Sequence, residues 1–170
     1  MNIKWIGAIF IIVGCSGAGF SISRAYRTDQ KLLKNIIRAI SYMENSLLYN
    51  LTPLPDLCRQ AGKVTSGTVH EIFLNLAREL DWQIAPDAYS CMYEALGKSH
   101  ALSPKIRRYF LQLGTSLGQF DLTGQVRELE TIRRSCEKEL TTLDNNLDNR
   151  IRSYKTLGIC AGLALAILFI

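Results

Sequence analysis

Charged residues are absent from both ends of the chain and frequent between them. Trp5–Ser23 is a run of 19 residues without a charge, and Leu157–Ile170 is a run of 14. As helices these runs would extend about 28 Å and about 21 Å, against a hydrocarbon core of about 30 Å. The pattern predicts transmembrane helices over residues 1–23 and 156–170, the second lengthened by Lys155, whose long side chain can reach the membrane surface.

Small side chains recur at helical spacing in both apolar segments. They are Gly7, Gly14 and Ala18 in the first segment and Gly158, Gly162 and Ala166 in the second. Residues four apart share a helix face, and small side chains there allow two helices to approach closely in lipid. Our interpretation is that the two segments pack on each other through these residues. Chance occurrence in a span rich in glycine and alanine is the alternative for the second set.

The middle of the chain, residues 24–155, has apolar positions at helical spacing and no strand-like alternation. Ile72, Phe73 and Leu76, for example, share one face of a predicted helix. Prolines interrupt the helical runs, as in the segment Thr52–Pro55, and Pro104 suits the first turn of a later helix. We therefore predict an all-α domain, an antiparallel bundle of about six helices flanked by the two transmembrane helices.

The last helix of this domain is predicted to start at Asp121 or Thr123. It can continue without a break into the C-terminal apolar segment. Its apolar residues keep near-heptad spacing, which is interrupted at Arg133. These residues can pack on helices of the same domain, or they can form a dimeric coiled coil. Both alternatives stay open, so a homo-oligomer is a candidate assembly.

The distribution of charge predicts an orientation in the membrane. All Lys and Arg residues but Lys4 lie in residues 24–155, and all 15 Asp and Glu residues lie there too. The resulting surplus of positive charge is too small to indicate a nucleic-acid binder. Basic residues such as Arg24, Arg27 and Lys155 flank the inner side of each apolar segment. The positive-inside rule then predicts a cytoplasmic middle domain with both termini outside.

The first apolar segment has a competing interpretation as an export signal. Ile12-Val13-Gly14-Cys15 is similar to a lipobox, and Ala18-Gly19 would suit cleavage of a signal peptide. However, the apolar run continues through Ile22 and is followed by Arg24 and Arg27, which oppose export of the following chain. We prefer an uncleaved anchor, with an exported lipoprotein-anchored helical domain as the alternative.

The sequence contains no motif for catalysis, a metal or a cofactor. His70 and His100 have no cysteine or carboxylate at metal-ligand spacing, the cysteines form no CxxC pair, and no P-loop or dinucleotide fingerprint occurs. Asp144–Asp148 begins like a calcium loop but lacks the glycine and the final glutamate that such a loop requires. Gly114 and Gly118 are expected to permit a close helix crossing or a bend. We therefore predict a protein that is not an enzyme.

Several short motifs follow one another in a fixed order along the chain. They are the run Ile6–Val13, the segment Tyr49–Leu54 with Thr52, Pro53 and Leu54, the segment Leu113–Gly118 with Gly114, Leu117 and Gly118, then Asp121 and Gln125, and the tail that starts at Leu157-Gly158. Their order, their spacing and the total length resemble the stage III sporulation protein AB family of endospore-forming bacteria. The resemblance covers essentially the whole chain.

That family is similar to the F-type inner-membrane platform proteins of type II secretion and type IV pilus systems. The resemblance implies a structural platform component, required for sporulation, of a secretion-like channel between mother cell and forespore. It implies a location in the mother-cell membrane that surrounds the forespore, with the central domain in the cytoplasm. The implied partners are a secretion-type ATPase and other membrane components of the channel. A membrane-bound regulatory adaptor that acts without any channel is the alternative.

If the central domain docks an ATPase, exposed arginines are candidates for the contact. They are Arg107, Arg108, Arg127, Arg133 and Arg134. Arginine is enriched where protein surfaces bind each other, and clustered positive charge steers association. Ordinary solvated helix faces account for the same residues, so this assignment is a hypothesis.

Overall fold

The computed structural model describes the backbone of most of the chain. The described residues are 27–49, 52–82, 86–99, 102–119 and 121–169. Side chains are described in the same ranges, except for residues 118–119 and 146–169.

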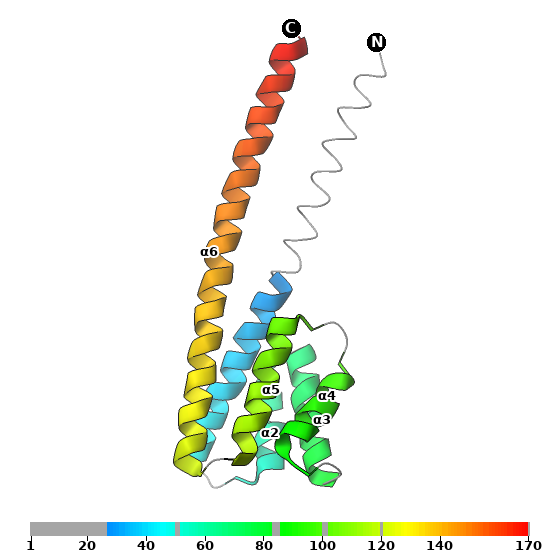
Figure 1. Ribbon diagram of the computed structural model, residues 1–170, viewed down its shortest axis with the longest axis vertical. Helices are drawn as coiled ribbons and strands as arrows, with labels where there is room; N and C mark the ends of the chain where they lie inside the picture. Colours follow the sequence, from blue (N-terminus) through cyan, green and yellow to red (C-terminus); the bar gives the residue numbers. More distant parts are fainter. Residues whose placement is uncertain (1–26, 50–51, 83–85, 100–101, 120, 170) are drawn as a thin grey trace. The chain divides into compact units, whose positions relative to one another are not determined.

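The described residues form helices and no strand. The first helix covers residues 27–49. It is followed by α2 (Leu54–Lys63), α3 (Thr68–Trp82), α4 (Ala88–Gly97), α5 (Pro104–Gln119) and α6 (Leu122–Phe169) (Figure 1). Six helices joined by short connections confirm the prediction of an all-α bundle. Pro104 is the first residue of α5, as predicted.

The chain divides into two compact units, and one of them, Asp29–Leu140, is the helical bundle. Within it α2 packs on α3, α3 on α4, and α4 on α5. The helices alternate in direction along the bundle, because short turns reverse the chain at each helix end (Figure 1). From Thr141 onward α6 belongs to the other unit.

The core of the bundle consists of the apolar faces that the helical spacing predicted. Ile72, Phe73 and Leu76 of α3 are all fully buried. The rings of Phe73 and Phe110 meet edge to face, with 6.1 Å between their centroids, so α3 and α5 contact each other through aromatic side chains. The 27–49 helix contributes a further buried set, namely Leu33, Ile36, Ala39, Ile40 and Met43.

Short polar side chains fix the starts of the helices. Asp87 precedes α4, and its Oδ1 accepts a hydrogen bond of 2.7 Å from the backbone N–H of Ser90. Hydrogen bonding to the side chain of Ser90, followed by this bond to its backbone, lowers the pKa of Asp87, because both stabilise the carboxylate form. Between α2 and α3, Gly67 has a φ of 62°, a left-handed conformation that glycine adopts at no steric cost.

The two apolar ends of the chain lie largely beyond what the structure describes. The N-terminal helix expected over residues 1–23 falls outside the described residues. In the described part of the chain, no helix combines the length and the apolar character needed to cross a bilayer. The backbone of α6 is one uninterrupted helix from Leu122 to Phe169, which confirms that the last helix continues into the C-terminal segment.

Three cysteines of the bundle, Cys58, Cys91 and Cys136, are buried and form no disulfide. Burial raises the pKa of the Cys58 and Cys136 thiols to about 12. Because only the thiolate reacts, we expect all three to react with a thiol reagent at least about tenfold more slowly in the folded chain than in guanidinium. A chain with Cys15 and Cys160 replaced by alanine allows the measurement.

The matched control for this prediction is Ser66→Cys, since Ser66 is exposed in the turn between α2 and α3. The introduced thiol should react as fast in the folded chain as it does in the chain unfolded by guanidinium. Equal native rates for the introduced and the natural thiols would contradict the buried placement.

Candidate interaction surface

The motif residues Leu117, Asp121 and Gln125 hold the turn between α5 and α6. The Asp121 Oδ1 accepts a hydrogen bond of 3.1 Å from the backbone N–H of Gly124, which caps α6. The Gln125 side-chain amide donates to the carbonyl of Leu117 at 3.1 Å, which joins the first turn of α6 to the end of α5. These residues therefore determine where α6 begins.

Gly114 lies where α5 crosses α4. A Cβ atom at this position would lie 2.8 Å from the Cβ of Met92, 3.2 Å from the Cα of Tyr89 and 3.3 Å from the carbonyl oxygen of Ala88. The absence of a side chain allows the two helices to touch through their backbones, which confirms the predicted close crossing. Gly118 also lies in α5, but its surroundings fall outside the described side chains.

The motif Thr52-Pro53-Leu54 ends one helix and starts the next. Leu54 is the first residue of α2, and the carbonyl of Pro53 accepts a hydrogen bond of 2.9 Å from the N–H of Leu57. Pro55 occupies the first turn, where its missing N–H needs no partner. This motif, like that after α5, positions helices.

The small residues assigned to helix packing in lipid cannot be placed in a contact. Gly7, Gly14 and Ala18 lie outside the described residues. Gly158, Gly162 and Ala166 belong to α6, where the four-residue spacing puts them on one side of the helix. Their surroundings fall outside the described side chains, so this packing stays a prediction.

Arg133 connects two helices of the bundle. Its Nε lies 3.1 Å from both carboxylate oxygens of Glu44 on the 27–49 helix, and its Nη1 donates to Glu137 at 2.8 Å. The side chains of Arg133 and Glu44 are only 24% and 14% exposed. The hydrogen bond to Glu137, followed by that to Glu44, raises the pKa of Arg133. The interruption of the heptad pattern at Arg133 therefore marks an ion pair between helices.

We expect Arg133→Met to lower the free energy of unfolding by about 2 kcal/mol, because it leaves the carboxylate of Glu44 largely buried and uncompensated. Arg134→Met is the matched control. Arg134 pairs with Glu130 on the surface of α6, with side chains 73% and 42% exposed, and its loss should change stability by less than about 0.5 kcal/mol. Urea denaturation followed by circular dichroism measures both, and equal effects would contradict a bridging role for Arg133.

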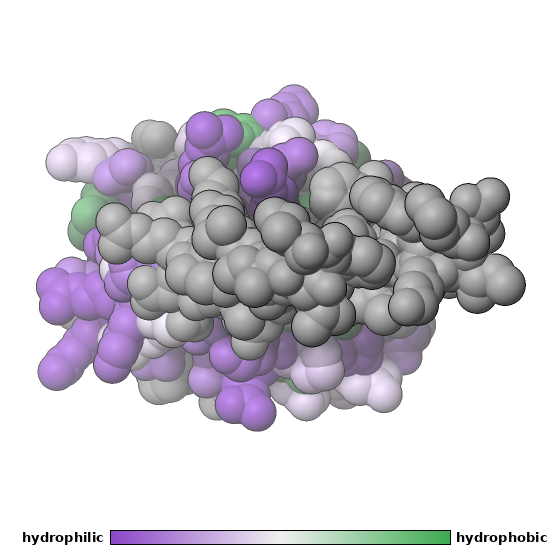
Figure 2. Space-filling model, turned by 90° about the horizontal axis from the view of Figure 1, so that it is seen from above, coloured by the Kyte–Doolittle hydropathy of each residue, from purple (hydrophilic) through white to green (hydrophobic). Residues whose placement is uncertain are grey.

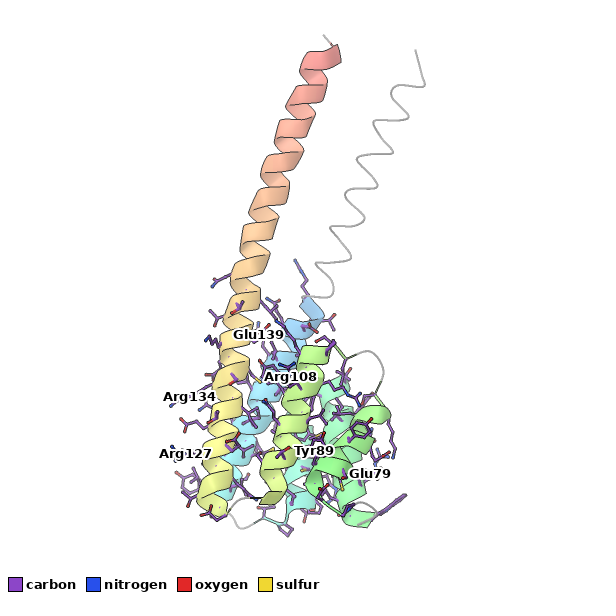
Figure 3. The ribbon with its side chains drawn as sticks, viewed as in Figure 1. Glu79, Tyr89, Arg108, Arg127, Arg134 and Glu139 are labelled. Carbon is purple, nitrogen blue, oxygen red and sulfur yellow. The ribbon has the colours of Figure 1, made fainter. Side chains whose placement is uncertain are left out.

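The five candidate arginines do not converge on one surface. The guanidinium of Arg107 lies over the ring of Tyr93, 5.3 Å from its centroid, and so ties α5 to α4. Arg108 is exposed on α5. Arg127 and Arg134 are seven residues apart on α6 and project away from the other helices of the bundle (Figure 3). Only the last two share an exposed face that a partner could contact.

No reactive centre is found among the described side chains. No group of three or more His, Cys, Asp or Glu residues in this part of the protein could hold a metal ion. Every buried side-chain nitrogen or oxygen described has a hydrogen-bond partner. The buried carboxylate of Glu79, which sequence reasoning did not single out, forms an ion pair with Lys98.

The fold and these motifs have counterparts in known proteins. A family profile described as Stage III sporulation protein AB matches residues 4–170. Stage III sporulation protein AB of Bacillus subtilis (strain 168) is 25% identical over 169 residues, which make up 98% of this chain and 98% of that protein. A solved structure of a stage III sporulation protein AB superposes with a TM-score of 0.62 at 19% identity, covering 69% of this chain and 94% of the other. The superposition shows a shared fold.

Proposed function

Since the chain belongs to the stage III sporulation protein AB family, we propose that it is a non-enzymatic structural platform of a secretion-like channel between mother cell and forespore. The match over residues 4–170 carries this proposal, because it spans the bundle and both apolar ends. The family membership confirms the resemblance and supports a role in sporulation. In the proposed arrangement the apolar ends anchor the chain in the mother-cell membrane around the forespore, and the cytoplasmic bundle docks a secretion-type ATPase.

The charge at one end of the bundle supports a membrane location. At the end where the chain enters at Asp29 and leaves at Leu140, which we call the basic end, exposed cations gather. They are Lys31, Lys34, Lys105, Arg108 and Lys138, and Lys105 forms an ion pair with Glu139. Figure 2 views the protein from this side, and most of the described side chains that are visible are hydrophilic. A basic surface on a domain that lies between two apolar segments of the sequence suits the anionic cytoplasmic face of a membrane.

The topology can be tested with an introduced thiol. Because Cys58, Cys91 and Cys136 are buried, the exposed Ser66→Cys variant without Cys15 and Cys160 is the better reporter. Non-sporulating cells that produce this variant in the plasma membrane would be treated with a membrane-impermeant maleimide before and after permeabilisation. Labelling only after permeabilisation supports the cytoplasmic bundle. Labelling of intact cells would indicate that the bundle lies outside the cytoplasm, where a cytosolic ATPase cannot reach it. This outcome would favour the exported lipoprotein-anchored domain.

Co-purification separates the platform from a regulatory adaptor. The platform should be recovered from sporulating cells together with the ATPase and with other membrane components of the channel, and it should form homo-oligomers or join a larger assembly. An adaptor would be recovered with a cytosolic protein alone. Recovery of the chain without any membrane component, under detergent conditions that preserve the complex, would reject the platform.

A further inference from the structure

The bundle has a second end, opposite the basic end, which we call the distal end. Within the bundle the 27–49 helix and the first part of α6 run in opposite directions (Figure 1), and the ion pair between Glu44 and Arg133 joins them. The end of the 27–49 helix therefore lies beside the start of α6 at Leu122. A helix of this length extends about 33 Å, so the distal end is one helix length from the point where the chain enters the bundle.

The start of α2 and the end of α3 belong to the same distal end. Arg59 of α2 forms ion pairs with Asp56 on its own helix and with Asp81 on the last turn of α3. Since α2 follows the 27–49 helix after a short connection, Trp82 lies at the end where that helix stops. Figure 1 shows these turns together at the end of the bundle away from the basic end.

Large apolar side chains are exposed at the distal end. Leu48, Tyr49, Trp82 and Leu122 are 59%, 83%, 71% and 41% exposed, and we call these four residues the distal patch. Tryptophan and tyrosine are the side chains that most often dominate the binding energy of protein interfaces. Large apolar side chains exposed at one end of a bundle are candidates for a surface that a partner covers.

Four exposed aspartates lie at or next to the helix ends of the distal end, namely Asp56, Asp81, Asp87 and Asp121. Arg59 pairs with the first two, and the exposed Arg78 and Arg127 lie within two turns of the same helix ends. Four carboxylates against three guanidinium groups leave a small surplus of negative charge. The distal end is thus opposite in charge to the basic end. A complementary partner surface would have an apolar centre bordered by lysine or arginine.

We propose that the distal patch is the docking surface for a protein whose contact surface is apolar at its centre and basic at its rim. The proposal rests on the proposed function, in which the docked partner is a secretion-type ATPase. It locates the contact with that partner at the distal end. One typical interface covers about 800 Å² on each partner, which is comparable with the end of a small bundle. Of the arginines suggested by the sequence, Arg107, Arg108, Arg133 and Arg134 are then outside the contact, whereas Arg127 lies near its edge.

The test measures binding of the purified ATPase to the full chain in lipid nanodiscs by biolayer interferometry. Tyr49→Ser and Trp82→Ser should each weaken binding at least about tenfold, because each removes an exposed aromatic side chain from the centre of the contact. Tyr93→Ser is the matched control, since Tyr93 is 52% exposed but lies on the flank of α4. Tyr49→Ser and Trp82→Ser should keep the helicity and the melting temperature of the parent chain to within about 2 °C, since exposed positions contribute little to stability. Tyr93→Ser removes the ring beneath Arg107 and should lower the melting temperature by a few degrees without weakening binding.

Charge variants test the rim separately. Asp56→Lys together with Asp81→Lys should weaken binding and reverse its dependence on salt, whereas Glu94→Lys, on the exposed side of α4, should not. Arg134→Glu, farther along α6 from the distal end, should leave the affinity unchanged. Loss of affinity only in this arginine variant would overturn the distal contact.

The outcomes separate this inference from the proposed function. If the ATPase binds the parent chain and every distal variant keeps its affinity, the distal contact is rejected while the docking of an ATPase stands. If the ATPase does not bind the parent chain at all, docking itself is rejected and the distal contact with it. Self-association through this end, seen as a mass in sedimentation that falls to the monomer in Trp82→Ser, would also reject it in favour of a second copy of the chain.

Discussion

Replacing Gly114 by valine should lower the free energy of unfolding by about 3 kcal/mol, or prevent the bundle from folding. The new Cβ alone would lie 2.8 Å from the Cβ of Met92 and 3.2 Å from the Cα of Tyr89. The second of these atoms is backbone and cannot rotate away, so α4 and α5 would have to separate. The separation would also disturb the packing of Met92, which is fully buried.

Gly97→Ala is the control for this prediction. Gly97 is the last residue of α4, and no atom lies within 4 Å of a Cβ built there. Alanine should raise stability there by up to about 1 kcal/mol, because it restricts the unfolded chain and favours the helix. Chemical denaturation of the full chain in detergent gives both values. A valine variant as stable as the parent would show that the crossing of α4 and α5 is looser than described.

Phe73→Ala should lower the free energy of unfolding by about 4 kcal/mol, since the removed ring leaves a cavity in the centre of the bundle. Phe73 is fully buried, and its ring meets that of Phe110 edge to face. The substitution removes burial of the ring and the aromatic contact between α3 and α5, and the surrounding helices can relax only in part.

Trp82→Ala, in the same helix, is the control for the Phe73 substitution. Trp82 is 71% exposed at the end of α3, so its truncation should change stability by less than about 0.5 kcal/mol. The same denaturation experiment distinguishes the two. If both aromatic residues gave similar small losses, Phe73 would not occupy the core position that its spacing and burial indicate.

The helices could be predicted because burial on one face imposes a period of 3.6 residues on the sequence. Ile72, Phe73 and Leu76 follow this period, and they are buried in α3 as predicted. Pro104 and Asp121 signalled helix starts through local chemistry alone, which needs no knowledge of the fold. The sequence predicted that Gly114 permits a close helix crossing or a bend, but it did not show which helix crosses there.

The ion pair of Arg133 could not be predicted from the sequence, because its partner Glu44 is 89 positions away along the chain. Helical spacing shows which residues share a face, and it does not show which face of another helix lies opposite. The heptad interruption at Arg133 therefore looked like a solvated position. For the same reason five arginines seemed equivalent, although Arg107 and Arg133 are engaged within the bundle.

The distal patch escaped prediction for a different physical reason. Leu48, Tyr49 and Trp82 are apolar residues at helix ends, where the helical spacing would normally assign them to the core. Whether such a residue is covered depends on how far the neighbouring helices extend past it. That length is decided by the turns, which the sequence fixes only to within a few residues.

The three buried thiols can serve as built-in probes of local unfolding in the bundle. Cys58, Cys91 and Cys136 lie one each in α2, α4 and α6. When a helix closes again faster than its thiol is modified, the modification rates report on local opening. The modification rate in the folded chain, divided by that in the unfolded chain, equals the equilibrium population of the opened state at that helix. Equal ratios at all three positions would describe a bundle that opens as one cooperative unit. A higher ratio at one of them would identify the helix that detaches first, with no probe added to the chain.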